Sequence, residues 1–551
     1  MKYMPQVSAK LSTATVCALI VAALAVVAPF AVRGVACGHD LTFHMNSWLE
    51  VAQQWRAGVL YPRWAANANY GSGEPRFLFY PPLSWMLGGA LGSFIPWLFV
   101  PVAFDVCAVF LAGLAMHRMA REWFEEPEAS LIAVAYALNP YMLLTIYVRS
   151  AFAELLAASF LPLLLLWIVR DRPAREMFVP LALTVAGVWL TNVPTAIIAT
   201  YAAVLLLVTV TIARRNSRVF MYGAIAIAMG LLLASFYIVP VLYEKSWITV
   251  AQFLSAGVRP VENFLFTRTG EPGHDSFLRR LSWLAAGEVI ATFVGAAVAM
   301  RWRGRNPRLW WSLVIPAIVA LLLMLPVTSL AYRLMPDLRF LQFPWRWLLV
   351  VSLAYAVFVI TALPGFRGKW ALFAVLFVGL IALCNRALQP ACDPEDTPFM
   401  ISNVFHTGYG YRGTDEYVPA GGDNYEIKPD FPEYRLRGID RNASPGDAHV
   451  SQFQGGVYHK HFVVDLPQPV AIVLRLMNYP AWRVAVNGAA VAPQSDDPTG
   501  RMVITLPAGP SDVEVRFVRT PDRWIGDGMS LAAVALLGGF WVCNRRRQFH
   551  H

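Results

Sequence analysis

An acidic residue follows directly after the first long apolar segment of the chain, in the stretch GHDLTFHMNSW. Asp40 is flanked there by His39 and His44. A carboxylate at the edge of a bilayer is unfavourable, so such groups are usually functional. Asp40 could take a proton from a hydroxyl group as a general base. It could also bind a divalent metal ion such as Mg²⁺ or Mn²⁺. The alternative is an N-cap for a helix that begins near Leu41.

A second pair of charged residues, Arg149 and Glu154, lies in the stretch NPYMLLTIYVRSAFAE. The planar donors of a guanidinium group suit a phosphate. Glu154 could be a second acid beside a sugar or a metal ion. The alternative is an Arg–Glu ion pair at the mouth of a helix, although their spacing does not stack the two side chains well on one helical face.

Two further stretches place charged groups among aromatic residues. The first, NYGSGEPRFLFYPPLSW, contains glycines that let the backbone approach a ligand closely, or that simply form tight turns. The second, LRFLQFPWRWLL, puts arginines at the outer entry to a helix, where a lipid phosphate or simple snorkelling would explain them. With the preceding GVLYPRW, these stretches contribute six candidate groups: Arg63, Glu74, Arg76, Tyr80, Arg339 and Arg346.

The composition defines the elements that must position these groups. Of 551 residues, 57% are hydrophobic and only 15% are charged, against about 25% charged in soluble proteins. Apolar runs separated by arginine clusters indicate a polytopic helical membrane protein with the arginines in the cytoplasm, which explains the net charge of +10 without nucleic-acid binding. Spans are expected near 12–33, 99–117, 129–143, 155–169, 178–192, 195–213, 220–242, 282–300, 309–327, 347–363, 371–387 and 526–543, about twelve in all.

This arrangement divides the chain into a transmembrane domain over 1–387, an outer domain over 388–525, and a last helix with a basic cytoplasmic tail over 526–551. The first outer loop covers 34–98, and its apolar stretch 82–97 is expected to be a helix that lies at the outer interface or re-enters from it. Short runs between turn signals predict that 388–525 is all-β, a sandwich or jelly roll, with five strands in VYHKHFVVDL, VAIVLRLMN, WRVAVNG, RMVITLP and VEVRFVR.

Three cysteines lie on the outer side, Cys37, Cys384 and Cys392, where a disulfide is chemically allowed. Either Cys384 and Cys392 are bonded, or all three thiols are free.

The order of these features resembles the GT-C superfamily, which comprises multipass glycosyltransferases that use polyprenyl-phosphate-linked sugars. The superfamily motif P-x(8)-R-x(4)-[DE] corresponds to Pro140, Arg149 and Glu154. More narrowly, GHDLTFHMNSW, GVLYPRW, GSGEPRFLFYPPLSW, LQFPWRWLL, TDEYVP and YPAWRVAVNG are similar to YfhO-like bacterial membrane proteins and to the related group labelled "6-pyruvoyl-tetrahydropterin synthase-related".

The resemblance implies a GT-C fold, a site that faces the periplasm, a polyprenyl-phosphate sugar donor, an inverting transfer, and Asp40 as the catalytic acidic position. Many GT-C enzymes carry paired acids in the first loop, whereas Asp40 has His39 and Leu41 beside it, which weakens the case for a metal.

The sequence therefore predicts a glycosyltransferase of the bacterial inner membrane. It would move a sugar from a carrier such as undecaprenyl phosphate to an envelope glycan, lipid or polymer. Asp40 would be the base, Glu154 would orient the acceptor or a metal, and Arg149, Arg76 and Arg346 would bind the donor phosphate. The substrate would also contact His39, His44, Arg63, Glu74, Tyr80 and Arg339.

Two alternatives remain: a non-catalytic translocator or binding protein for polyprenyl-phosphate sugars, and an assembly subunit whose β domain binds polysaccharide. Membrane lipids are partners in every case. In the glycosyltransferase interpretation the β domain positions the acceptor, and its acids Asp415 and Glu416 influence acceptor affinity only modestly.

Overall fold

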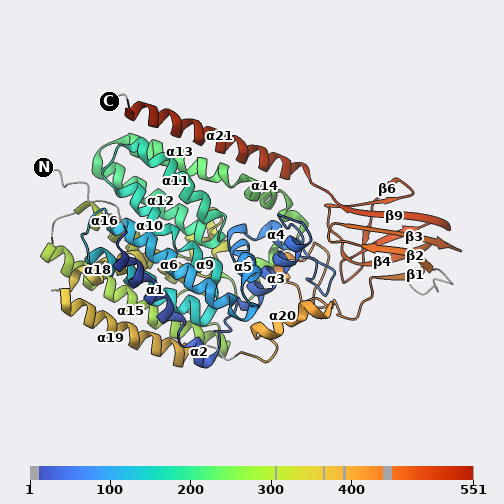
Figure 1. The fold of residues 1–551 in the computed structure, drawn as a ribbon, viewed down its shortest axis with the longest axis horizontal. Helices are drawn as coiled ribbons and strands as arrows, with labels where there is room; N and C mark the ends of the chain where they lie inside the picture. The colour runs from blue at the N-terminus through green and yellow to red at the C-terminus, as the bar shows by residue number, and fades with distance from the viewer. Residues whose placement is uncertain (1–10, 304–306, 364–365, 389–391, 439–448, 550–551) are drawn as a thin grey trace.

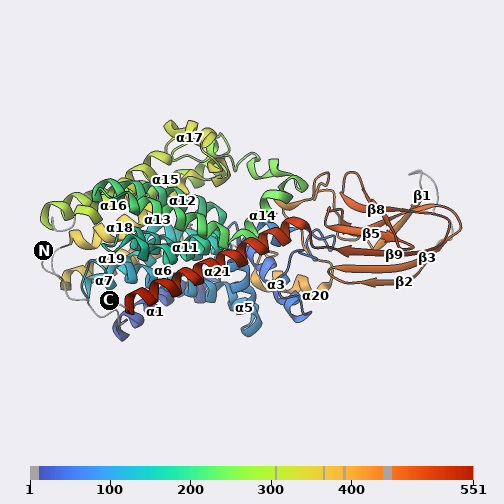
Figure 2. The ribbon, with the colours of Figure 1, turned by 90° about the horizontal axis from the view of Figure 1, so that it is seen from above.

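A computed structural model describes residues 11–303, 307–363, 366–388, 392–438 and 449–549; the end of the basic tail, 550–551, lies outside these ranges. A helical body occupies most of the molecule, and two β-sheets project from one end of it (Figure 1). The last helix, α21 (Pro521–Phe549), runs along the body from the β-sheets to the opposite end (Figure 2).

The helices of the body coincide with the apolar runs of the sequence, and each predicted span falls on one helix or on two joined at a break. In chain order they are α1 (Thr13–Val27), α2 (Phe30–Arg33), α6 (Val100–Ala120), α7 (Glu128–Ala137), α8 (Pro140–Leu144), the π-helical turn η2 (Thr145–Arg149), α9 (Phe152–Ala157), α10 (Phe160–Val169), α11 (Ala174–Trp189), α12 (Val193–Arg214), α13 (Ser217–Leu233), α14 (Ser235–Glu244), α15 (Pro272–Arg303), α16 (Pro307–Leu323), α17 (Ser329–Leu334), α18 (Leu348–Ala362), α19 (Phe366–Leu383) and α21.

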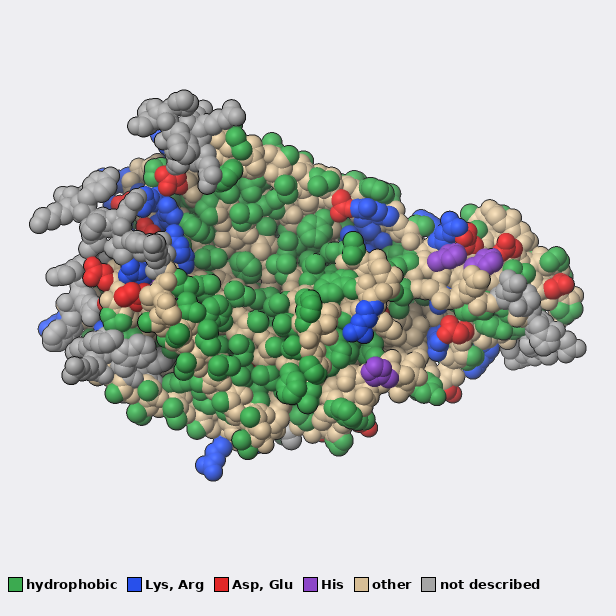
Figure 3. All heavy atoms as spheres, in the orientation of Figure 1, with side chains coloured by type: hydrophobic (Ala, Val, Ile, Leu, Met, Phe, Trp, Pro, Cys, Tyr) green, Lys and Arg blue, Asp and Glu red, His purple; other side chains and the backbone are tan. Residues whose placement is uncertain are grey.

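Eight helices in the described residues are long and apolar enough to cross a membrane, or ten if each of two bent pairs is one span. The predicted class, a polytopic helical membrane protein, is therefore confirmed, while the number twelve stays a prediction. Hydrophobic side chains cover the middle of the visible face, and charged side chains gather toward its two ends (Figure 3). This is the surface expected of a protein that crosses a bilayer.

Three spans form the interior of the body. The spans Glu128–Arg149, Phe152–Val169 and Pro344–Ala362 are 100%, 83% and 83% buried, whereas α21 is only 17% buried over its apolar window. The first two are consecutive, so they form a hairpin with its turn at residues 150–151. Because protein rather than lipid surrounds this hairpin, charged groups at its turn can be held by other parts of the chain.

The first outer loop folds into α3 (Leu41–Arg56), α4 (Arg76–Phe79) and α5 (Pro82–Phe94), between the helical body and the β-sheets (Figure 1). The stretch 82–97 is thus largely helical, as the sequence predicts. It packs closely on α3, because a Cβ atom at Gly88 would lie 2.3 Å from the ring of Trp48. Glycine at this position allows the two helices to approach.

The β region contains two antiparallel sheets, with strand orders β1-β4-β8-β7 and β2-β3-β9-β5-β6. The strands are β1 (Tyr434–Gly438), β2 (His449–Gly455), β3 (His459–Leu466), β4 (Val470–Met477), β5 (Trp482–Val486), β6 (Ala489–Val491), β7 (Gln494–Ser495), β8 (Arg501–Leu506) and β9 (Gly509–Phe517). The five strands expected from alternating patterns are β3, β4, β5, β8 and β9. The segment from 392 to 433, which was expected to be part of an all-β unit, instead contains helix α20 (Pro398–Thr407) and lies outside both sheets.

The predicted cysteine chemistry was wrong in both of its alternatives. The disulfide joins Cys37 to Cys392, with Cα atoms 5.1 Å apart. Cys384 is a free thiol and is fully buried at the start of the π-helical turn η9 (Cys384–Leu388). The pairing therefore ties the start of the first loop to the segment that leads to the β region.

We expect Cys384→Ser to keep this cross-link and Cys37→Ser to abolish it, because Cys37 and Cys392 form the bond and Cys384 is a buried free thiol. Peptide mapping by mass spectrometry without reduction measures the result. A cross-linked peptide that contains Cys384 in the parent protein would contradict the pairing.

Candidate active site

The turn of the buried hairpin positions the predicted arginine and glutamate. Arg149 ends the π-helical turn, and Ser150 adopts a left-handed conformation with φ +49° that stops the helix before α9 begins. Short π-helical segments inside helices are frequent at functional sites. The break lets Arg149 and Glu154 meet, although their spacing would not bring them together on a continuous helix.

Glu154 is buried and has two arginine partners. Its Oε2 lies 2.7 Å from Arg149 Nη1 and 3.1 Å from Arg346 Nε, and the hydroxyl of Tyr141 donates a hydrogen bond to its Oε1. The side chains of both arginines are less than one-tenth exposed. Two buried guanidinium groups thus face this carboxylate, and Arg149 also lies beside a second one, that of Asp40.

Arg346 has unused donor capacity. Its Nη1 donates to the carbonyl of Leu341 at 2.9 Å, and its guanidinium lies over the ring of Phe343. Its buried Nε is close to Glu154, but no acceptor among the described residues is aligned with it for a hydrogen bond. An anion that entered the site could accept from this atom.

Asp40 reaches the same place from the first loop. Its backbone N–H donates to the carbonyl of Arg149 at 2.9 Å, and a carboxylate oxygen lies 3.6 Å from Arg149 Nη2. A Cβ atom at Gly38 would lie 2.4 Å from the backbone of Arg149, so this close approach requires glycine. Asp40 occupies the N-cap position of α3, yet its side chain accepts no capping hydrogen bond. The carboxylate, 40% exposed, is instead directed toward Arg149.

Both histidines and Tyr80 lie around Asp40. Burial lowers the pKa of His44 to about 4 and also lowers that of His39, while the charge of Asp40 opposes both shifts. Both rings are therefore largely neutral at pH 7. Burial raises the pKa of Tyr80, and the charges of Asp40 and Glu154 add to this effect. His44 and Tyr80 contact each other edge to face, with ring centroids 5.8 Å apart.

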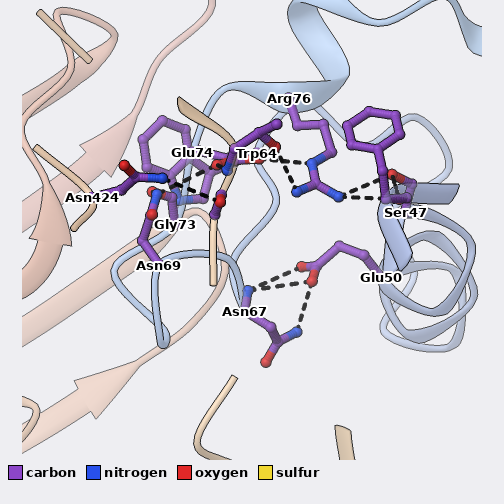
Figure 4. Close-up of polar contacts among 12 residues, drawn as sticks. Ser47, Glu50, Trp64, Asn67, Asn69, Gly73, Glu74, Arg76 and Asn424 are labelled. Carbon is purple, nitrogen blue, oxygen red and sulfur yellow. Dashed lines mark hydrogen bonds and ion pairs between the residues drawn. The ribbon is translucent and has the colours of Figure 1, made fainter. Parts of the chain in front are cut away.

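Arg76 and Glu74 form a different cluster. Arg76 Nε donates to Glu74 at 2.7 Å, and its other nitrogens donate to Ser47, the Phe43 carbonyl and Thr414 (Figure 4). Arg76 is 2% exposed and Glu74 is fully buried. The geometry favours a structural role for the pair, which joins the first loop to residue 414, and the predicted phosphate contact of Arg76 stays a prediction.

The other two predicted groups are placed elsewhere. Arg63 lies over the ring of Tyr61 at 4.4 Å. The charges that act on it are those of Arg523 in α21, of Arg519 just before that helix and of Glu244 at the end of α14. Arg339 is exposed and covers the ring of its neighbour Phe340. Of the predicted site residues, the structure brings together Asp40, His39, His44, Tyr80, Arg149, Glu154 and Arg346.

Two site residues were missed by the sequence analysis. Tyr141 lies in the stretch already singled out, but nothing in its spacing predicted the contact with Glu154 across the helical break. Glu416 was assigned to the β domain, whereas its charge interacts with Asp40 and Arg346. The stretch TDEYVP, which contains Glu416 and is among those quoted for the family resemblance, is the signal that could have identified this residue.

A divalent metal has no matching set of ligands here. Within the described ranges, no group of three or more His, Cys, Asp or Glu side chains could hold a metal ion. Glu154, the second predicted acid, already faces two arginines.

No protein-family model and no curated protein matches the chain. Among solved structures, arabinofuranosyltransferase AftD from Mycobacteria is similar over 75% of this chain and 28% of its own, with 17% identity and a TM-score of 0.41. The apo oligosaccharyltransferase of Archaeoglobus fulgidus is similar over 72% of this chain and 56% of its own, with 15% identity and a TM-score of 0.34. ArnT from Cupriavidus metallidurans is similar over 63% and 78%, with 16% identity and a TM-score of 0.29.

The chain thus spans little more than a quarter of the mycobacterial protein and just over half of the archaeal one. Two of the three proteins are named as sugar-transferring enzymes, the class that the sequence predicts. With identities and TM-scores this low, the similarities carry no argument about activity, which rests on the residues of the site.

Proposed function

We propose that the chain is a membrane glycosyltransferase of the GT-C type that moves a sugar from a polyprenyl-phosphate carrier to an acceptor hydroxyl. The observation that supports this most is the meeting of Asp40 with Arg149 and Arg346 at the turn of the buried hairpin. A base and buried guanidinium groups held beside it are the two features that such a transfer needs.

In the proposed reaction, Asp40 takes the proton of the acceptor hydroxyl as its oxygen forms a bond to C1 of the sugar. The bond from C1 to the phosphate oxygen breaks at the same time, and the configuration at C1 inverts. The negative charge of the leaving polyprenyl phosphate develops beside Arg149 and Arg346. These guanidinium groups are held in place before the reaction, so they stabilise the charge without reorganising.

A lipid carrier suits this position. Its phosphate can lie at the membrane boundary beside the arginines while its apolar tail stays among the hydrocarbon chains. We further propose that the site faces the periplasm of the inner membrane. The Cys37–Cys392 disulfide supports this side, because Cys37 is close in sequence to Asp40 and disulfides persist in oxidising compartments.

Native mass spectrometry of the protein in nanodiscs with undecaprenyl phosphate tests the donor class. We expect Arg346→Gln to weaken binding about tenfold or more, because hydrogen bonds to charged groups contribute about 1.5–3 kcal/mol each. The matched control is Arg333→Gln, which changes an exposed arginine of α17 and should bind like the parent. Equal binding by both variants would argue against a phosphate beside Arg346.

A further inference from the structure

The segment from 392 to 425, called here the crossing segment, passes over the first loop before the β region begins. Tyr411 exchanges backbone hydrogen bonds with Asn67 and Tyr70, at 3.0 Å each. Further along, the backbone N–H and the hydroxyl of Thr414 both donate hydrogen bonds to the carboxylate of Glu74. These contacts fix the short turn η10 (Asp415–Tyr417) beside the first loop.

The two acids of this turn have different surroundings. Asp415 accepts hydrogen bonds from Asn424 at 2.7 Å and from Tyr425 at 3.0 Å. For Glu416, the one side-chain hydrogen bond found in the described part of the chain is long, 3.5 Å from Gln342 Nε2. Asp415 is therefore held within the crossing segment, whereas Glu416 keeps most of its hydrogen-bonding capacity.

Glu416 interacts electrostatically with charged groups of the active site. The charged and titratable groups that face it are Asp40 from the first loop, Arg346, its neighbour Asp415, and Tyr417. Burial raises the pKa of Glu416 to about 7; the charges of Asp40 and Asp415 add to this, while the Gln342 hydrogen bond and Arg346 oppose it. The contacts place Glu416 in the same region. Its hydrogen-bond partner Gln342 directly follows Leu341, whose carbonyl accepts from Arg346. The ring of the next residue, Tyr417, lies beside that of Phe43, which is close in sequence to Asp40.

Aromatic rings line the same region. Phe43 lies between Tyr80 and Tyr417, with centroid distances of 4.8 Å and 6.2 Å. Phe43 and Tyr80 are half-buried, so they keep some accessible surface. A surface with aromatic rings and two carboxyl groups can contact the C–H faces of a sugar ring and accept hydrogen bonds from its hydroxyls.

We propose that the acceptor is a saccharide and that Glu416 binds one of its hydroxyl groups while Asp40 takes the proton of another. This inference rests on the proposed function, and it narrows the acceptor from any molecule with a hydroxyl group to a saccharide. A simple lipid alcohol has a single hydroxyl, which Asp40 alone would serve. A saccharide presents several hydroxyls, and a second carboxyl group across the site orients the one that attacks.

Binding of the acceptor can be measured without knowing the donor. The method is saturation-transfer NMR of octyl hexosides and octyl pentosides with the full chain in nanodiscs. Octanol is the matched ligand without a sugar. We expect Glu416→Gln to reduce saturation of the sugar-ring protons several-fold, and Asp415→Asn to leave it unchanged. If the ionised carboxylate accepts the hydroxyl, parental affinity should rise about tenfold from pH 6 to pH 8, following a pKa of about 7. The dependence should be much smaller in Glu416→Gln, because burial lowers the pKa of His44 to about 4 and also lowers that of His39.

Three results would overturn the inference: no octyl glycoside binds the parent, octanol binds as well as the glycosides, or Glu416→Gln and Asp415→Asn behave alike. Undecaprenyl-phosphate binding, measured on the same samples, separates this inference from the proposed function. If Glu416→Gln still binds undecaprenyl phosphate but no longer binds the glycosides, the proposed function and this inference are both supported. If the parent binds glycosides through Glu416 but does not bind undecaprenyl phosphate, the proposed polyprenyl-phosphate donor is refuted and the saccharide site stands.

Discussion

Replacing Asp40 with asparagine is expected to reduce sugar transfer by about 10²–10⁴-fold, the usual effect of losing a general base. Asparagine has nearly the same shape and cannot take the proton of the acceptor hydroxyl. The fold should be unaffected, because the side chain of Asp40 makes no capping hydrogen bond to α3 and contacts Arg149 only at 3.6 Å.

The measurement is single-turnover transfer in proteoliposomes from a panel of polyprenyl-phosphate sugars, together with undecaprenyl-phosphate binding. Glu395→Gln, which neutralises an exposed acid of the crossing segment, is the control and should behave like the parent. Asp40→Asn should keep carrier binding while losing transfer. Normal transfer by this variant would remove Asp40 as the base. Carrier binding by the parent without any transfer would favour a translocator, which has no need of a base.

Replacing Arg149 with alanine is expected to have two effects, one on stability and one on the donor. Glu154 would keep Arg346 but lose its 2.7 Å partner in a buried position. Removing one member of a buried ion pair typically destabilises a protein by about 3–5 kcal/mol. Carrier binding and transfer should fall together, because Arg149 is also proposed to bind the phosphate.

The lysine variant separates these effects. Arg149→Lys keeps a positive charge beside Glu154, so it should retain most of the thermal stability that the alanine variant loses. Its carrier binding and transfer should lie between those of the parent and the alanine variant, since lysine keeps the charge without the planar fork of donors. Parental carrier binding and transfer in both the lysine and the alanine variants would show that Arg149 only balances Glu154.

Local patterns in the sequence predicted most elements of the fold. Long apolar runs predicted the helices of the body, and period-two alternation predicted five of the nine strands that the structure describes, because both signals depend on neighbouring residues. The arginine clusters placed Asp40, Arg149 and Glu154 on one side of the membrane, and the structure brings these three residues together.

Contacts between residues far apart in the chain were decided only by the tertiary structure. The disulfide joins cysteines 355 positions apart, so nearness in sequence favoured the wrong partner. Arg76 appeared as available as Arg346, yet its donors are taken by Glu74 and Thr414, while Arg346 meets Glu154. Residue types thus defined which reactions the site could support. Packing of the first loop, the hairpin and the crossing segment determined which charged groups meet, because electrostatic interactions depend on distances in space.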